Sequence, residues 1–327
     1  MLLAANLSAL KPSTLTASRA VPAHLAGRFR DPIGFQQSKD GQYFVFDRRG
    51  HTVYGLDEQL TSTWEIVQIG AEAGRIIDPT AFAVEPDGTF AVADAPNNRE
   101  RIQIFSAAGA RLGGFLLPGR ATTRVTLENM VMNGVGTLQY TGTTILLSQP
   151  ETGALIAEYS LRGAVNRLIG NLRTTGHEED EPLHLALNSG IPLADPSSPT
   201  GGFFFVFQAG EPLFRKYDRD GRLVFERRIE GREIDPLLAA LPTTWPRRRT
   251  SEGELPLVSP TVRTAAVDPE GNLWISFVSP FTYVYDGDGD KIRVLQFRGA
   301  GVLSPRGLFF GKRGLLATPG LLEFTRP

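Results

Sequence analysis

One short stretch of the sequence concentrates imidazole and carboxylate groups. It consists of residues 177–181 (HEEDE) and the nearby His184, and the other histidines are His24 and His51. Three converging nitrogen or oxygen ligands can hold zinc, so one hypothesis is a metal-assisted hydrolase or lyase centred on His184 and this acidic loop. The competing interpretation is a solvated loop, because consecutive acidic residues are most often exposed.

Other routes to catalysis lack the residues that they need. The chain has no cysteine, which excludes disulfides, thiolate metal sites and a cysteine nucleophile. No serine stands in the GxSxG spacing of a nucleophile elbow. The acidic run 286–290 (DGDGD) is not an EF-hand loop, because Lys291 and Phe297 occupy the positions of the required glycine and glutamate. We therefore predict no catalytic residue, no metal site and no cofactor.

A repeated pattern of short strands must position any functional side chains. In residues 80–117, four alternating segments are separated by turn residues, of which EPDG at 85–88 is the clearest. The corresponding first turn recurs near residues 41, 88, 136, 202, 271 and 314. Four strands in each unit and a period of about 40–50 residues are typical of β-propeller blades.

We predict an all-β fold of one domain, residues 1–327: a six-bladed β-propeller of four-stranded antiparallel blades. An N-terminal strand is expected to complete the last blade and close the ring. Residues 184–188 are expected to form the innermost strand of the fourth blade, and residues 162–182 and 230–259 to be inserted loops, the second with a helical turn at 236–240. The predicted blades span residues 31–70, 78–118, 126–162, 183–229, 261–298 and 303–327, with 13–22 added to the last.

Residues 92–99 (VADAPNNR) carry a more specific signal. Followed by RIQIF at 101–105, they resemble the NHL repeat, in which ADxxNNR leads into IQ(I/V)F, with Glu100 as an inserted residue. The resemblance implies a bacterial-type six-bladed NHL-like propeller, in a superfamily of binding modules with some enzymes. Zinc-dependent lyases of this type use several channel-facing histidines, and gluconolactonase-like hydrolases use a glutamate where Asp31 stands here.

The loops that lead into the innermost strands are predicted to gather around one mouth of the central channel. Arg30, Arg263 and Arg306 occupy similar positions there, which favours an anionic ligand with a carboxylate or phosphate group. For Asp94 and Asn98, a purely local role in turn hydrogen bonds is an alternative. The predicted function is a non-catalytic binding scaffold for a protein, a peptide or a small anionic ligand. The candidate ligand-binding residues are Arg30, Asp31, Asp47, Arg48, Asp78, Asp94, Asn98, His184, Arg263 and Arg306.

Charge and hydropathy argue against several classes of partner. With 34 basic and 35 acidic residues the net charge is −1, whereas nucleic-acid binders carry a basic excess or stripe. The basic run WPRRR at 245–249 is the segment that suggests RNA binding, but a solvent-exposed loop is the simpler interpretation. No apolar run reaches the ~18 residues of a membrane span, and we expect a monomer. The start, MLLAANLSAL, has no basic residue, so we expect a cytoplasmic protein, or a periplasmic or secreted one if an export signal lies upstream.

Overall fold

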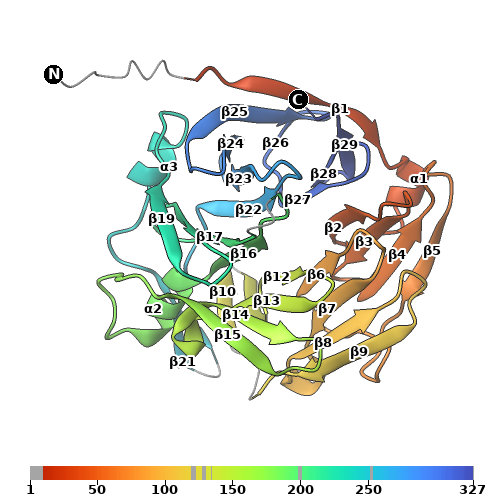
Figure 1. The fold of residues 1–327 in the computed structure, drawn as a ribbon, viewed down its shortest axis with the longest axis horizontal. Coiled ribbons are helices and arrows are strands. Elements are labelled where there is room, and N and C mark those ends of the chain that lie inside the picture. Colours follow the sequence, from red (N-terminus) through yellow and green to blue (C-terminus); the bar gives the residue numbers. More distant parts are fainter. Residues whose placement is uncertain are drawn as a thin grey trace.

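The computed structural model describes residues 10–118, 123–126, 130–133, 135–197, 201–250 and 253–326. Within these ranges most regular structure is β-strand, and the sheets stand in a ring around a common centre (Figure 1). The α-helices are short segments between strands, namely α1 (Ala23–Ala26), α2 (Glu181–Asn188) and α3 (Asp235–Ala239). In the part of the chain that is described, no helix is long and apolar enough to cross a membrane.

Four of the sheets are separate antiparallel units of four strands each. Each is a meander in which successive strands lie progressively farther from the centre of the ring (Figure 1). The first contains β2 (Pro32–Gln37), β3 (Tyr43–Asp47), β4 (Thr52–Leu56) and β5 (Thr63–Val67). The second contains β6 (Ala81–Val84), β7 (Phe90–Asp94), β8 (Arg101–Phe105) and β9 (Arg111–Leu116). The third contains β12 (Leu138–Tyr140), β13 (Thr144–Ser148), β14 (Ala154–Ser160) and β15 (Val165–Asn171). The fourth contains β16 (Gly190–Ala194), β17 (Phe203–Phe207), β18 (Leu213–Tyr217) and β19 (Leu223–Arg228).

A nine-stranded sheet completes the ring, and the N-terminal strand β1 (Ser13–Ala20) lies in its middle. β1 pairs in parallel with β25, where Ser13 is opposite Leu295, and antiparallel with β29, where Ala17 is opposite Phe324. The pairing of β1 with the last strand joins the two ends of the chain, as the extended segment at 13–22 predicts. The other strands are β22 (Val262–Val267), β23 (Leu273–Phe277), β24 (Thr282–Tyr285), β25 (Lys291–Arg298), β26 (Val302–Leu303), β27 (Gly307–Phe310), β28 (Leu315–Thr318) and β29 (Leu322–Phe324).

The innermost strands surround the centre (Figure 1), and contacts between neighbouring sheets indicate that they begin on one face of the ring. They are β2, β6, β12, β16, β22 and β27. Side-chain bonds between neighbouring sheets fix this alignment. Near the starts of β12 and β16, Thr137 Oγ1 donates to the Gly190 carbonyl at 2.7 Å. Near the ends of β2 and β6, Val84 N donates to Gln36 Oε1 at 2.7 Å. The face on which these strands begin is termed the upper face, and the opposite one the lower face.

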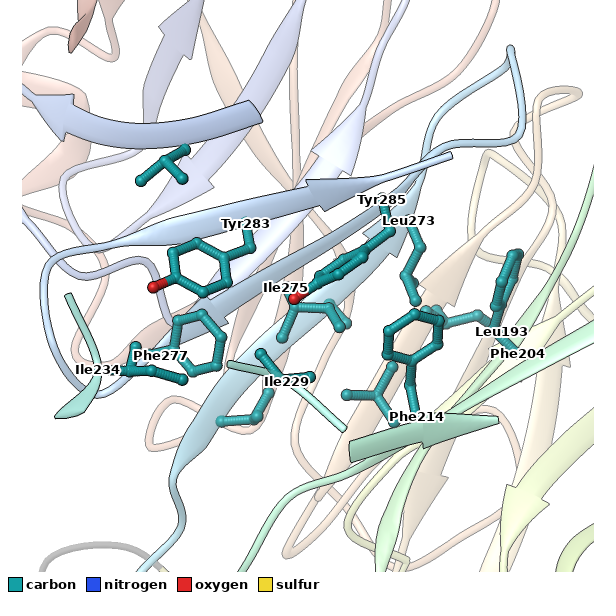
Figure 2. Close-up of a cluster of buried hydrophobic side chains, with 14 residues drawn as sticks. Leu193, Phe204, Phe214, Ile229, Ile234, Leu273, Ile275, Phe277, Tyr283 and Tyr285 are labelled. Atoms are coloured by element: carbon teal, nitrogen blue, oxygen red, sulfur yellow. The ribbon is translucent and has the colours of Figure 1, made fainter. Parts of the chain in front are cut away.

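The core lies between adjacent sheets, because each sheet has two apolar sides. The second strands β3, β7, β17 and β23 are buried along their whole length, as expected where both sides are covered. The Phe46 and Phe82 rings stack across the first two sheets with centroids 5.2 Å apart. Figure 2 shows the cluster between the fourth sheet and β22–β25, which includes Phe214 and Tyr285. The centroids of these two rings are 4.8 Å apart. Burial of each such ring contributes roughly 1.5–3 kcal/mol.

The predicted strand at 184–188 is wrong, because these residues belong to helix α2. The sequence LHLAL alternates like a strand, yet Leu183 and Leu187 are also spaced by one helical turn, and both are buried. Pro182 at the start of the helix costs no hydrogen bond, since the first N–H groups of a helix have no internal partner. The innermost strand of the fourth sheet is instead β16.

The third sheet begins and ends one strand later than predicted. Its described strands span 138–171 instead of 126–162, so β15 comes from the expected loop 162–182. A separate two-stranded hairpin, β10 (Thr123–Thr126) with β11 (Met130–Asn133), occupies the start of the predicted blade. The second expected loop, 230–259, contains α3 and the hairpin of β20 (Arg247–Thr250) with β21 (Gly253–Pro256). The DGDGD run forms the turn between β24 and β25, and Asp286 Oδ1 accepts the Asp288 and Asp290 N–H groups at 3.0 and 2.9 Å.

Candidate functional site

The described residues surround a cavity of about 1440 Å³ at the centre of the ring. Its wall is formed by the innermost strands, and most of its surface is apolar. Charged side chains lie at the two ends, on the upper and lower faces, which are termed the upper mouth and the lower mouth. The cavity therefore has an apolar body between two polar openings. The apolar side chains of the wall include Phe35, Phe82, Leu138, Leu193, Ala265 and Leu308.

Arginines dominate the upper mouth. Arg30 lies two residues before β2, Arg306 directly precedes β27, and Arg263 is the second residue of β22. These three side chains, which the sequence predicts to share one mouth, line the same cavity. Among the described residues of this mouth, five cations face three anions. They are Arg30, Arg48, Arg49, Arg263 and Arg306 with Asp31, Glu151 and Glu181.

Asp31 and Arg48 form an ion pair at the rim of the upper mouth. Arg48 Nε and Nη2 both donate to Asp31 Oδ2, at 3.0 and 2.8 Å. Each side chain is 22% exposed, so water reaches the pair and screens it only in part. Asp31 thus offsets part of the positive charge that Arg48 brings to the mouth.

Asp47 positions the loop that carries Arg30 and Asp31. Its carboxylate is fully buried and accepts the backbone N–H groups of Arg30 at 2.7 Å and of Asp31 at 2.8 Å. The N–H group of Gly50 donates to the same carboxylate at 3.0 Å. Asp47 is absent from the cavity wall. The sequence predicts Asp47 as a ligand-binding residue, but backbone N–H groups engage its carboxylate, which holds the loop of Arg30 and Asp31 in place.

Asp94 has the same place in the second sheet as Asp47 in the first, at the end of the second strand. Its carboxylate accepts the Ile77 N–H at 3.2 Å and receives Arg101 Nε and Nη2 at 2.9 and 2.6 Å. The side chain is 0% exposed and lies outside the cavity wall. The alternative of a local structural role therefore fits Asp94 better than ligand contact.

Asp78 and Asn98 are also outside the cavity wall. Asn98 ends a turn of 3-10 helix (Pro96–Asn98) in which Asn97 and Asn98 have φ of 54° and 62°, values that asparagine tolerates better than most residues. Asp78 has φ of 48°, is 72% exposed and lies 3.8 Å from His51 Nε2. Both residues serve loops beside the upper mouth and do not face the channel.

His184 lies on α2 and makes a local contact. Its Nδ1 is 2.7 Å from Thr175 Oγ1, and Glu178 Oε1 is 4.0 Å away. Glu178 accepts the Thr175 N–H at 2.8 Å, while Asp180 pairs with Arg247 on the hairpin β20–β21. The carboxylates of the acidic loop therefore point to different partners. Among the described residues, no group of three histidine or acidic side chains is arranged to hold a metal ion.

Helix α2 and the hairpin β20–β21 form one side of the upper mouth, which sequence analysis missed. Leu183 and Leu187 pack with Ala209 and Val258, and Trp245 covers this cluster. The basic run at 245–249 thus has structural partners: Trp245 in the cluster and Arg247 with Asp180.

Arg173 anchors the end of α2. Its guanidinium donates to the carbonyls of Leu187, Ala209 and Glu211 at 3.0, 2.7 and 3.0 Å. It also lies 4.5 Å from the centre of the Phe207 ring, and burial lowers the pKa of Arg173 to about 10. Three carbonyls and an aromatic face offset part of the cost of burying this charge. The helix is therefore held firmly beside the mouth.

The lower mouth carries one acidic side chain that sequence analysis missed as well. Glu85 follows β6 directly and lines the cavity with Pro86 and Thr141. Within the described structure no hydrogen bond or ion pair reaches its carboxyl group, and burial raises the pKa of Glu85 to about 7, with a further contribution from Asp87. The sequence signal was present, since an acid directly after an innermost strand must lie at the channel's end, but EPDG predicts only a turn.

No family model matches the chain, and no curated protein matches it. Solved structures do. The structure of a streptogramin B lyase is 13% identical over 89% of this chain and 91% of that chain, with a TM-score of 0.50. A protein of unknown function from Bacteroides caccae is 14% identical over 80% of both chains, with a TM-score of 0.46.

The ring of four-stranded antiparallel sheets, together with the likeness to the lyase structure, decides the fold. It is a β-propeller. At this level of identity the likeness concerns the fold of the propeller alone, and the reaction named for the lyase does not carry over. The chemistry of this propeller has to be argued from its own side chains.

Proposed function

We propose that this propeller is a non-catalytic binding scaffold that takes a small anionic ligand at its upper mouth. The observation that carries the proposal is the placement of Arg30, Arg263 and Arg306 around one cavity. Guanidinium groups donate in a fixed fork that matches carboxylate and phosphate oxygens. An excess of arginine over acid at the opening also attracts anions before contact.

The proposal includes a finer description of the architecture. We propose that the nine-stranded sheet consists of two blades. One contains β22 to β25, and the other contains β27 to β29 together with β1. With the four separate sheets this makes six blades in one domain over residues 1–327. The second blade then carries the NHL-like motif of residues 92–105. Each of the six innermost strands would bring one loop to the upper mouth; two of these loops and the start of β22 would each bring an arginine.

Binding of simple anions tests the proposed function. Citrate and inorganic phosphate serve as probes in isothermal titration calorimetry at low salt. Loss of one charge-assisted contact costs about 1.5–3 kcal/mol, so R30A, R263A and R306A should each weaken citrate binding about tenfold or more. Arg111 is an exposed arginine on the outer strand β9, and R111A is the matched control that should bind like wild type. Equal binding by all four variants and wild type would refute the upper-mouth site.

A further inference from the structure

The two mouths of the channel differ in charge, and one strand connects them. Thr80 precedes β6 and lines the cavity on the upper side, while Glu85 follows β6 on the lower side. Five residue steps of extended chain span roughly 17 Å. A ligand that touches both the arginines and Glu85 must therefore be elongated.

The wall between the mouths offers mainly apolar contacts. Phe82 lies on β6, and Leu138 and Leu308 lie on the innermost strands of other sheets. Such a wall contributes roughly 25 cal/mol for each Å² of apolar ligand surface that it covers. It would also leave a polar ligand body without hydrogen-bond partners, which is costly. The middle of the ligand should accordingly be apolar.

Glu85 determines the chemistry at the far end. In the described structure no cation and no donor meets its carboxyl group, and its charged neighbour Asp87 is itself an acid. Asp87 is occupied by Thr89, whose N–H and Oγ1 donate to its Oδ1 at 2.9 and 2.7 Å. A half-buried carboxyl group beside another acid repels anions and gains most from a cation that enters with the ligand.

We propose that the channel takes an elongated ligand with an anionic group at one end, an apolar body and a protonated amine at the other end, held by Glu85. This inference rests on the proposed function, because the arginines fix the anionic end at the upper mouth. The amine can belong to an aminoalkyl carboxylate or to the N-terminus of a short apolar peptide. Both share the same end-to-end charge pattern.

Two pairs of probes that differ only in the amine test the inference by calorimetry. The alkyl pair is ω-aminododecanoate and dodecanoate, whose extended length suits the span. The peptide pair is hexaalanine with a free and with an acetylated N-terminus. Because a charge-assisted bond to a partly buried carboxylate is among the stronger hydrogen bonds, the amine-bearing member of whichever pair binds should bind about tenfold to a hundredfold tighter.

The variant E85Q should abolish this preference while dodecanoate still binds. E72Q makes the same change outside the cavity, where the Glu72 side chain is 62% exposed, and should keep the preference. ω-Aminohexanoate, which is too short to reach both ends, should show no advantage over hexanoate. Thermal unfolding of E85Q confirms that the variant is folded.

The outcomes separate the two proposals. If dodecanoate binds and depends on Arg30, but the amine adds nothing or E85Q changes nothing, the Glu85 assignment is overturned and the upper-mouth site stands. If dodecanoate, citrate and phosphate all fail to bind folded wild-type protein, both proposals fall.

Discussion

Asp31 Oδ2 receives both Nε and Nη2 of Arg48, at 3.0 and 2.8 Å, at the rim of a cavity that both residues line. The acid therefore competes with any anionic ligand for this guanidinium. Because the pair is partly open to water, the competition is moderate in strength. In the proposed function, the pair would limit how tightly the mouth holds a small anion.

Removal of the Asp31 charge should strengthen anion binding. In D31N the amide keeps a hydrogen-bond acceptor but no longer offsets the charge of Arg48, so citrate should bind about three- to tenfold tighter at low salt. Calorimetric titration at two salt concentrations measures the effect, which should shrink as salt rises. The double variant D31N/R48A should lose the gain, and an equal gain without Arg48 would contradict this account.

Loss of the Asp47 carboxylate should destabilise the protein. D47A leaves three backbone N–H groups in a buried site without their acceptor, among them those of Arg30 and Asp31. Each unsatisfied buried donor costs about 1–3 kcal/mol, and partial access of water brings the total to roughly 3 kcal/mol.

Urea unfolding measures the cost, with D40A as its control, because Asp40 is an exposed turn residue. D40A should stay within about 0.5 kcal/mol of wild type. Equal stability of D47A and D40A would show that the loop before β2 does not depend on Asp47.

Glu85 should make stability depend on pH. Its pKa in the folded protein is raised to about 7, above the ordinary value for a glutamate, so the folded state holds this proton longer than the unfolded chain does. The resulting stabilisation is complete at pH 4 and is lost as the pH rises through 7.

E85Q removes this pH-dependent term. The variant should therefore gain stability relative to wild type between pH 4 and pH 8, by about 1 kcal/mol after allowance for solvent screening. Urea unfolding at both pH values measures the difference. A constant difference between the two proteins across this range would show that Glu85 ionises as an exposed glutamate does.

Phe324 should be critical for the contact between the last strand and the rest of the ring. Its ring is fully buried and lies 4.9 Å from the Phe297 ring, on β25. Replacement of a buried phenylalanine by alanine costs about 3–5 kcal/mol, so F324A should lower the urea midpoint substantially. Leu112 is 60% exposed on β9, and L112A should leave the midpoint nearly unchanged. A small effect of F324A would mean that the ring tolerates a loose last strand.

Purified protein should contain no stoichiometric zinc or calcium. His184 Nδ1 lies beside Thr175 Oγ1, and the acids near it have other partners. Elemental analysis after dialysis against metal-free buffer measures the content. One equivalent of zinc that disappears in H184A would favour the metal-assisted hydrolase or lyase over the binding scaffold.

Local signals in the sequence determined how much of the fold could be predicted. Gly88 and Gly271 have φ of 85° and 88°, which glycine adopts without strain, and such turns mark the units clearly. The pairing of residues 13–20 with the last strand followed from counting strands. The prediction of a strand at 184–188 was wrong because the spacing of the leucines in this segment is compatible with both a strand and a helix. The predicted bounds of the third sheet were wrong because the glycines at 134 and 136 resemble the first turn of a unit. The first strand of that sheet in fact begins after them, at Leu138.

The residues of the candidate site could be predicted only where a residue lies next to, or at the end of, an innermost strand, because that position determines whether it faces the channel. Arg30, Arg263 and Arg306 satisfy that rule and line the cavity. Asp47 and Asp94 fail it because they end a second strand, where the backbone of the incoming loop takes up their oxygens. Glu85 satisfies the rule at the other end, yet a turn motif hid it. Polar type alone does not distinguish a residue that binds a ligand from one that shapes the loop.

The strand β1 is held between β25 and β29, and this arrangement governs how the molecule is made. Of the described strands, β1 leaves the ribosome first and β29 last, so the seam can form only after translation has passed every other strand. Contacts between such distant segments form slowly. Until β25 and then β29 are made, β1 has no strand to pair with and presents bare edges to other nascent chains, and a chaperone that shields β1 would raise the yield of closed molecules.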